Sequence, residues 1–280
     1  MINLHKYIKE SLLDDEDEIM TSAETSMLNK EVQEWIGDEY EVTNDKKYIM
    51  TRSAHHTKIY FGDLDIKLSE LNKLNSRGLK FQPIKEISIS DRNVDDYLKN
   101  IHIEGCGKVY ITPDFNKGID FNKMNFDPIF IDLAANYWNL IAPKKHVPYV
   151  FLRKTRWTNE DSDWENVKDW DCDVLILSTA PFENWNDGKY TIGDFDKEKL
   201  QILVNNNPKA KQILLYDNAF NSENIYKINT SGAKRKITSV VKRKVSYVDF
   251  IYDEVDKYNE TVVKDFEKKY GYDKKPIRLR

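Results

Sequence analysis

The sequence is poor in the residues that build cross-linked folds and metal sites. It has two cysteines, Cys106 and Cys172, and five histidines among 280 residues. Two thiols cannot form a disulfide framework or a four-thiolate zinc site, and such low cysteine use fits a reducing compartment. The histidines are dispersed, and the adjacent pair His55 and His56 would point to opposite faces of a strand. We therefore expect no metal and no cofactor.

Glycine is also scarce, and the motifs that depend on it are missing. The ten glycines form no G-x-x-x-x-G-K-[ST] phosphate loop, no G-x-G-x-x-G dinucleotide motif and no G-x-S-x-G nucleophile elbow. Long apolar runs are missing as well, because no stretch approaches the roughly 20 residues that a membrane helix requires. The sequence therefore favours a protein that is neither an enzyme nor membrane-embedded.

Hydrophobic and aromatic residues are plentiful enough for a folded core, at 40% and 12% of the chain. The net charge of −4 argues against a general nucleic-acid binder. The charge is uneven, however: residues 1–45 carry −10, with five consecutive acids at 14–18, and residues 231–280 carry +6. This polarity suits a protein oriented in an assembly, a charged partner, or two solvated ends.

Helical spacing dominates the start of the chain. Residues 2–13 predict a short amphipathic helix, and the acidic run then predicts a solvated linker, so residues 1–20 are expected to form a terminal helix and linker appended to the body. A second helix is expected from Ser22 to a stop at Gly37, with one apolar stripe that includes Met27 and Val32. The β-branched segments that follow make residues 21–85 a helix plus a β cap.

Residues 86–244 form the expected α/β body. Short apolar cores recur at steps of about 20 to 25 residues, which are long enough for crossovers between parallel strands. A leucine-rich-repeat-like solenoid fits the irregular connections. A doubly wound sheet is the alternative, although only 196–206 reads as a strong connecting helix. Residues 245–280 predict a long amphipathic helix, which would cap the open end of the sheet, and a basic tail.

Four tryptophans and two arginines form the main candidate partner site, because both residue types are favoured at interaction hot spots. Packing of these loops against the sheet is the alternative. The residues are Arg153, Arg156, Trp157, Trp164, Trp170 and Trp185.

A basic run near the end of the expected body is a second candidate, for an acidic partner or for nucleic acid, although a solvated strand pair is the simpler interpretation. Its residues are Lys234, Arg235, Lys236, Lys242, Arg243 and Lys244.

Carboxylates give only weak candidates for chemistry. Asp63, Asp65 and Lys67 form a D-x-D-x-K string that would share one face of a strand, as in a metal-dependent nuclease. Asp169, Asp171 and Asp173 alternate before a buried strand, where a cation site or a solvated turn is possible. Chance strings of this kind are common in an acidic chain, so we expect solvated carboxylates at both places.

The opening Leu-His-Lys-Tyr-Ile-Lys-Glu-Ser resembles the short tag of internal head proteins of tailed bacteriophages. In that family the tag directs a protein into the capsid and a protease cuts after a glutamate, which implies processing at Ile8, Glu10 and Ser11 here. The body resembles phage leucine-rich-repeat-like proteins, although their regular leucine and glycine positions are missing.

The sequence as a whole predicts a non-enzymatic protein-interaction protein, phage-encoded and associated with the virion, whose partner is a capsid or other virion component. The alternatives are a host-directed interaction protein in the bacterial cytoplasm and a divergent metal-dependent hydrolase that uses Asp63 and Asp65.

Overall fold

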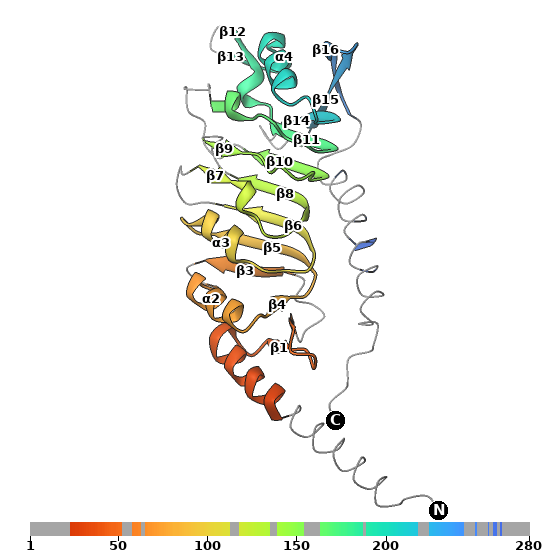
Figure 1. Ribbon diagram of the computed structural model, residues 1–280. Helices are drawn as coiled ribbons and strands as arrows, with labels where there is room; N and C mark the ends of the chain where they lie inside the picture. The colour runs from red at the N-terminus through yellow and green to blue at the C-terminus, as the bar shows by residue number, and fades with distance from the viewer. Residues whose placement is uncertain are drawn as a thin grey trace, which may run out of the picture.

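The computed structural model describes residues 23–51, 58–62, 65–112, 118–134, 139–153, 163–186, 189–217 and 224–243, together with Phe250, Lys257, Glu260, Thr261 and Lys264. Over these residues the chain is α/β, with a nine-stranded sheet that extends through the length of the molecule (Figure 1). None of the helices within these residues is long and apolar enough to cross a membrane.

Seven parallel strands join the large sheet in chain order and always on the same side, and two antiparallel strands follow. The nine are β3 (Lys58–Gly62), β5 (Ile84–Ser90), β6 (Cys106–Ile111), β8 (Pro128–Ala134), β10 (Tyr149–Arg153), β11 (Val174–Ser178), β14 (Gln212–Asp217), β15 (Asn224–Ser231) and β16 (Lys236–Lys242). The parallel strands begin 21 to 26 residues apart, except for 38 residues before β14. The predicted rhythm of parallel strands is thus confirmed.

The apolar core at Ile237–Val241 does not continue the series of crossover strands, and the simpler interpretation of the basic run as a solvated strand pair is confirmed there. This segment forms β16, which pairs antiparallel with β15 through a turn at residues 232–235, so the sheet is mixed. A connection of four residues permits a hairpin, whereas a parallel pair needs a crossover of a dozen or more.

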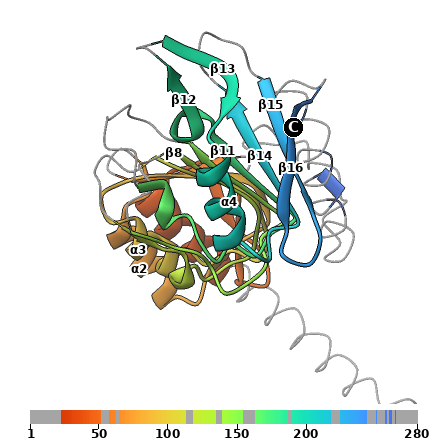
Figure 2. The same ribbon diagram turned by 90° about the horizontal axis from the view of Figure 1, so that it is seen from above.

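The remaining elements are short. The described helices are residues 23–36, α2 (Leu68–Ser76), α3 (Val94–Asn100) and α4 (Lys197–Asn206), with 3-10 turns η1 (Phe121–Lys123), η2 (Asp163–Asn166) and η3 (Ala180–Phe182). Three small sheets comprise β1 (Tyr40–Val42), β2 (Tyr48–Thr51) and β4 (Lys80–Phe81); β7 (Ile119–Asp120) and β9 (Leu140–Ile141); and β12 (Glu183–Asn186) and β13 (Lys189–Phe195). Viewed from above, the β12–β13 hairpin projects beyond the body (Figure 2).

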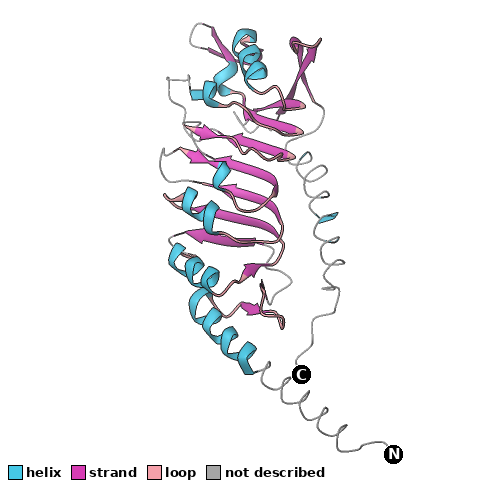
Figure 3. Ribbon diagram, viewed as in Figure 1, coloured by secondary structure: helices cyan, strands magenta, loops and turns pink. Residues whose placement is uncertain are grey.

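The main core lies between one face of the large sheet and the helices along it (Figure 3). Alternate strand residues such as Ile87 and Val109 belong to the same buried cluster as Leu71 of α2 and Leu200 of α4. A single face therefore receives α2, α3 and α4, as expected when right-handed crossovers always advance in one direction.

Local signals placed the helix ends well. The predicted helix at 196–206 is confirmed as α4, whose N-cap Asp196 accepts hydrogen bonds from the backbone of Glu198 and Lys199. The helix at 23–36 ends at Gly37, where φ is +110°. Its predicted stripe is only partly buried, because Val32 is fully buried and Met27 is 67% exposed.

The far face of the sheet contacts a residue of the predicted C-terminal helix. Phe250 is helical and buried, and it belongs to a second apolar cluster with Phe130 and Phe151. The helix was expected to cap the open end of the sheet, but Phe250 contacts the far face of the sheet instead, so the expectation is wrong at this residue. Residues 1–20 and most of residues 245–280 lie outside the described part of the chain.

Candidate functional site: the far face of the sheet

Residues with side chains on the far face of the sheet, opposite α2, α3 and α4, line up across the parallel strands. The register places Lys58, Glu86 and Lys108 in one row on β3, β5 and β6. The next row contains Tyr60, Ser88, Tyr110 and Asp132. We call the polar and aromatic residues of this region the polar patch: Lys58, Tyr60, Glu86, Ser88, Lys108, Tyr110, Asp132 and Arg153.

Opposite charges on neighbouring strands meet across the polar patch. Lys58 Nζ lies 2.6 Å from Glu86 Oε1. Asp132 receives two cations, with Arg153 Nε at 2.7 Å from Oδ1 and Lys108 Nζ at 3.6 Å from Oδ2. Cross-strand pairs of this kind stabilise a sheet modestly and fix the positions of long side chains.

The ring of Tyr110 lies at the centre of these cations. Arg153 Cζ is 4.9 Å from the ring centroid, Lys58 Nζ is 5.6 Å and Lys108 Nζ is 5.8 Å. Lys58 Nζ also lies 4.9 Å from the centroid of Tyr60. Aromatic rings attract cations through their negative faces, so the rings and cations hold one another in place.

Two ionisable groups of the patch have shifted pKa values. Burial raises the pKa of Asp132 and outweighs the opposing effect of Arg153 and Lys108. For Lys58 burial lowers the pKa, but the hydrogen bond from Lys58 to Glu86 and the charge of Glu86 outweigh burial, so the net shift is upward. Lys58 therefore stays a cation over the whole neutral range.

The polar patch is accessible while its centre is fixed. Tyr60 is 49% exposed, and the side chains of Lys58 and Arg153 are 31% and 30% exposed. Asp132 beneath them is buried. Ordered cations and aromatic rings that solvent still reaches are the usual anchors of a protein-binding surface.

Gly62 at the end of β3 allows the two strands at this edge to approach. Its φ is +147°, and a Cβ at this position would lie 2.3 Å from the carbonyl oxygen of Ser90. A larger residue would force β3 away from β5, and β3 carries Lys58 and Tyr60.

The same face is apolar on the later strands. Phe130, Phe151, Val174, Ile176, Leu214 and Ile225 form one buried cluster with Phe250. We call the six strand residues of this cluster the apolar patch. The Phe151 ring packs edge-on against Tyr216, with centroids 5.4 Å apart. The far face is thus divided into an accessible polar patch and a covered apolar patch.

The prediction that Trp164 and Trp170 lie at a surface is wrong. Trp164 and Trp170 are 3% and 1% exposed, and their rings pack against Phe182 and Phe121. The indoles fill the core between the connections and the sheet, because their large apolar rings are more stable there than in water. Trp157 and Arg156 lie outside the described residues, as does the side chain of Trp185, whose backbone belongs to β12.

Arg153 is the one member of the predicted tryptophan and arginine site that the structure describes at a surface, in the polar patch. The expected D-x-D-x-K strand is not formed: β3 ends at Gly62, and Asp65 and Lys67 follow it beside an isolated bridge at Ile66. Asp63, His55 and His56 lie outside the described residues, as do Ile8, Glu10 and Ser11.

The carboxylates of the acidic turn before β11 are paired with other side chains of the protein. His146 Nδ1 lies 2.8 Å from Asp171 Oδ1, Lys209 Nζ lies 3.4 Å from Asp171 Oδ2 and Lys211 Nζ lies 2.6 Å from Asp173 Oδ1. A hydrogen bond from His146 is the main cause that lowers the pKa of Asp171, and one from Lys211 lowers that of Asp173. Within the described chain, no group of three or more His, Cys, Asp or Glu could hold a metal.

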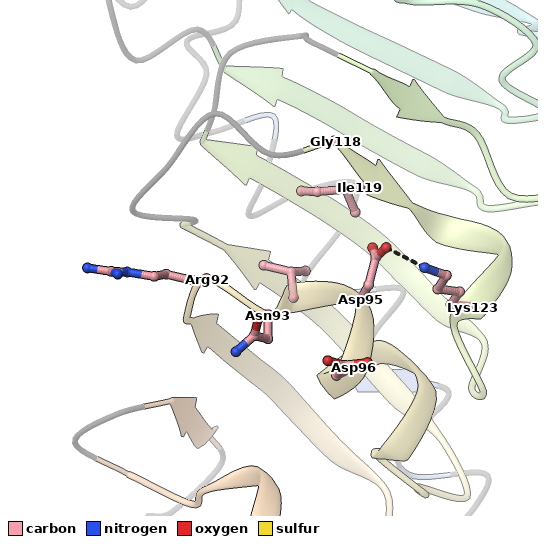
Figure 4. A pocket seen from close by; sticks show the side chains of 8 residues that line it. Arg92, Asn93, Asp95, Asp96, Gly118, Ile119 and Lys123 are labelled. Carbon is pink, nitrogen blue, oxygen red and sulfur yellow. Dashed lines mark hydrogen bonds and ion pairs between the residues drawn. The ribbon is translucent and has the colours of Figure 1, made fainter.

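A polar pocket of about 230 Å³ lies beside α3, where β5 ends (Figure 4). Its main charges already meet, since Lys123 Nζ is 2.6 Å from Asp95 Oδ2. The other oxygen, Oδ1, accepts a hydrogen bond from the backbone of Asp120. The pocket therefore offers a ligand no free carboxylate at Asp95.

The polar patch matches no motif, but the alternation of polar and apolar residues in its strands is a sequence signal for it. Lys58-Ile59-Tyr60-Phe61 and Lys108-Val109-Tyr110-Ile111 alternate polar and apolar residues, as strands with one accessible face do. The later strands instead contain unbroken apolar runs such as Val174–Leu177 in β11 and Ile213–Leu215 in β14, as strands buried on both faces do.

No protein-family model, curated protein sequence or solved structure matches this chain, so its function is inferred from its own residues.

Proposed function

We propose that this protein is a non-enzymatic interaction protein with a solenoid-like body, and that it binds a protein partner through the polar patch. The observation that carries the proposal is the ordered set of cations around Tyr110, beside the exposed ring of Tyr60. Interfaces of proteins are anchored by tyrosine, tryptophan and arginine side chains held in fixed positions.

The strand order supports the solenoid part of the proposal. Seven parallel strands follow one another in space as in the chain, with steps of 21 to 26 residues over most of the body. Such steps match the period of leucine-rich repeats. In a solenoid each repeat contributes one strand to a continuous surface, so a partner would contact several strands at once.

The charges of the patch favour a protein over nucleic acid. Lys58, Lys108 and Arg153 are balanced by Glu86 and Asp132 in close ion pairs. A phosphate backbone would repel these carboxylates, and a nucleic-acid surface needs a clear surplus of cations. A protein surface that bears both signs of charge complements the patch better.

The resemblance of the first residues to a capsid-targeting tag supports a partner among virion components. This part of the proposal predicts that mass spectrometry of purified virions will find the protein, with its chain starting at Ser11. Intact residues 1–10 in the virion would contradict the processing, and absence from the virion would favour a partner in the bacterial cytoplasm.

The interaction is tested by quantitative capture from disrupted virions on immobilised protein. Tyr60→Ala combined with Lys58→Glu should reduce capture of the partner at least about tenfold. Ile141→Ala removes a side chain that is 51% exposed and lies in β9, away from the patch, and it should leave capture unchanged. Equal capture by both variants, with circular dichroism showing that both are folded, would contradict the proposal.

A further inference from the structure

A basic groove lies at the other end of the molecule, between α4 and the turn that joins β15 to β16. Its volume is about 580 Å³. It is lined by Gln201, Val204, Asn205, Pro208, Ala233, Lys234, Arg235 and Lys236. The lining includes three consecutive cations, which form a basic wall, and the apolar residues Val204 and Pro208.

Side-chain hydrogen bonds fix the shape of this groove. Arg235 Nη1 donates to the carbonyl oxygens of Asn207, at 2.9 Å, and Pro208, at 3.3 Å. Gln201 Nε2 donates to the carbonyl oxygen of Arg235, and Gln201 Oε1 accepts from the backbone N–H of Ile237. The turn is thus bound to α4, and the basic wall is ordered before any ligand arrives.

Two cations of the wall remain available to a ligand. Lys234 and Lys236 are exposed, and neither side chain has an ion pair or hydrogen bond within the described part of the chain. Arg235 is occupied by α4, so it holds the wall while Lys234 and Lys236 present their charges. A segment with several adjacent carboxylates complements this arrangement.

The chain itself contains such a segment in the run Asp14–Glu18, five consecutive acidic residues. We propose that the basic groove binds the Asp14–Glu18 run of a second copy of this chain. The carboxylates would contact Lys234 and Lys236.

The run cannot reach the groove of its own chain. Glu24 pairs with Lys46 in the β1–β2 connection, at the β3 end of the molecule, and Figure 1 shows β16 at the opposite end. From β3 to β15 there are seven strand spacings, about 34 Å in all. The six residues from Glu18 to Glu24 span at most about 21 Å. Binding therefore has to occur between copies.

Contacts of this kind are heterologous, because each copy uses one end to bind the other end of its neighbour. Such contacts do not close at two copies and lead to chains of copies or to rings. The polar patch takes no part in this association, so the two proposals can fail separately.

The association is tested by sedimentation velocity of the full-length protein over a concentration series at about 20 mM salt. The weight-average mass should rise above the 33.1 kDa of the monomer, and it should return to the monomer value at about 0.5 M salt, where charges are strongly screened. A protein that stays monomeric at low salt and high concentration would overturn the proposal.

Two variants locate the contact. The groove variant, Lys234→Glu with Lys236→Glu, reverses the charges of two lysines that line the groove. The run variant neutralises the acidic run by combining Asp14→Asn, Asp15→Asn, Glu16→Gln, Asp17→Asn and Glu18→Gln. Each variant alone should be monomeric. Their mixture should form a dimer and nothing larger, because the intact run of the groove variant meets the intact groove of the run variant.

Lys227→Glu with Lys242→Glu is the matched control, since both lysines are exposed on the same hairpin but do not line the groove. The same change of charge at these positions should leave the apparent dissociation constant within about twofold. Association that survives neutralisation of Asp14–Glu18, or that is lost equally in the control, would overturn the proposal.

Discussion

The polar patch and the apolar patch share one face of one sheet, but they differ in what covers them. In the polar patch, Tyr60 is half-exposed and the cations around Tyr110 reach solvent. In the apolar patch, Phe151 and Ile176 are fully buried, with Phe250 packed in the same cluster. The strands of both patches are parallel except for β15, so the side chains on this face, rather than the strand direction, decide whether a stretch of it is a surface or a core.

Every parallel strand is buried on the side of α2, α3 and α4, so the strands differ in whether their far side is buried too. The strands that carry Ile87 and Val109 are polar on their far side, where an interaction surface is proposed. On the later strands a second layer of apolar contacts adds to stability. We therefore expect substitutions in the apolar patch to act on folding and substitutions in the polar patch to act on binding.

The largest effect is expected for Phe151→Ala. This residue is fully buried in the apolar patch and contacts the ring of Tyr216, so its removal should reduce the free energy of unfolding by about 3–5 kcal/mol. The matched change in the polar patch, Tyr60→Ala, should cost less than about 1 kcal/mol, because the ring is half-exposed. Urea unfolding measures both, and equal losses would break the comparison.

A slightly smaller effect is expected for Phe250→Ala. Phe250 is 1% exposed and is the described contact of the predicted C-terminal helix with the apolar patch. Its loss should reduce the free energy of unfolding by about 3 kcal/mol. The midpoint of thermal unfolding should fall, while capture of a partner by the polar patch should be unchanged. An unaltered midpoint would show that this contact does not stabilise the sheet.

The two cysteines allow local opening to be compared along the sheet. Cys106 begins β6 in the region of the polar patch, and Cys172 precedes β11 in the region of the apolar patch; both are buried. Burial raises both thiol pKa values, that of Cys172 to about 12, so labelling requires opening. In the variants Cys106→Ala and Cys172→Ala, labelling at pH 8 should be at least about tenfold slower at Cys172 than at Cys106. Faster labelling at Cys172 than at Cys106 would contradict the expectation that the sheet opens less readily at the apolar patch than at the polar patch.

The smallest effect concerns acid. The pKa values of Asp171 and Asp173 are lowered from 3.8, mainly by His146 and Lys211 respectively. Their stabilising contribution is complete above the unfolded pKa and is lost as the pH falls through the lowered folded values. Asp171→Asn with Asp173→Asn should therefore flatten the decline of the unfolding free energy between about pH 4 and pH 2. The exposed Glu165→Gln is the control, and a decline of unchanged slope in the double variant would contradict the assignment.

Much of the fold could be predicted because it depends on local patterns. The helix at 196–206 and the stop at Gly37 follow from caps and periodicity, and the spacing of apolar strands predicted the parallel pairing. The direction of β16 could not be predicted from its composition, because Ile237–Val241 resembles the other strands. The turn at 232–235 decides it, since only a hairpin fits so few residues.

The site was harder to predict, because its residues come from five strands. Residue type predicts a surface site for Trp164 and Trp170, because tryptophan is favoured at interaction hot spots. Their packing against Phe182 and Phe121 instead places both in the core. Lys58, Tyr110 and Asp132 belong to no motif, and only the register of the four parallel strands β3, β5, β6 and β8 brings them together.

By itself the sequence determined the α/β class, most strand positions and the uneven charge of the chain, because these depend on residues close to one another along it. Tertiary structure alone decided which strand faces are covered and which polar side chains meet. The physical reason is that the cost of burying Asp132 and the benefit of burying Trp170 depend on neighbours that are distant in sequence. Those neighbours come together only when the strands have paired in register.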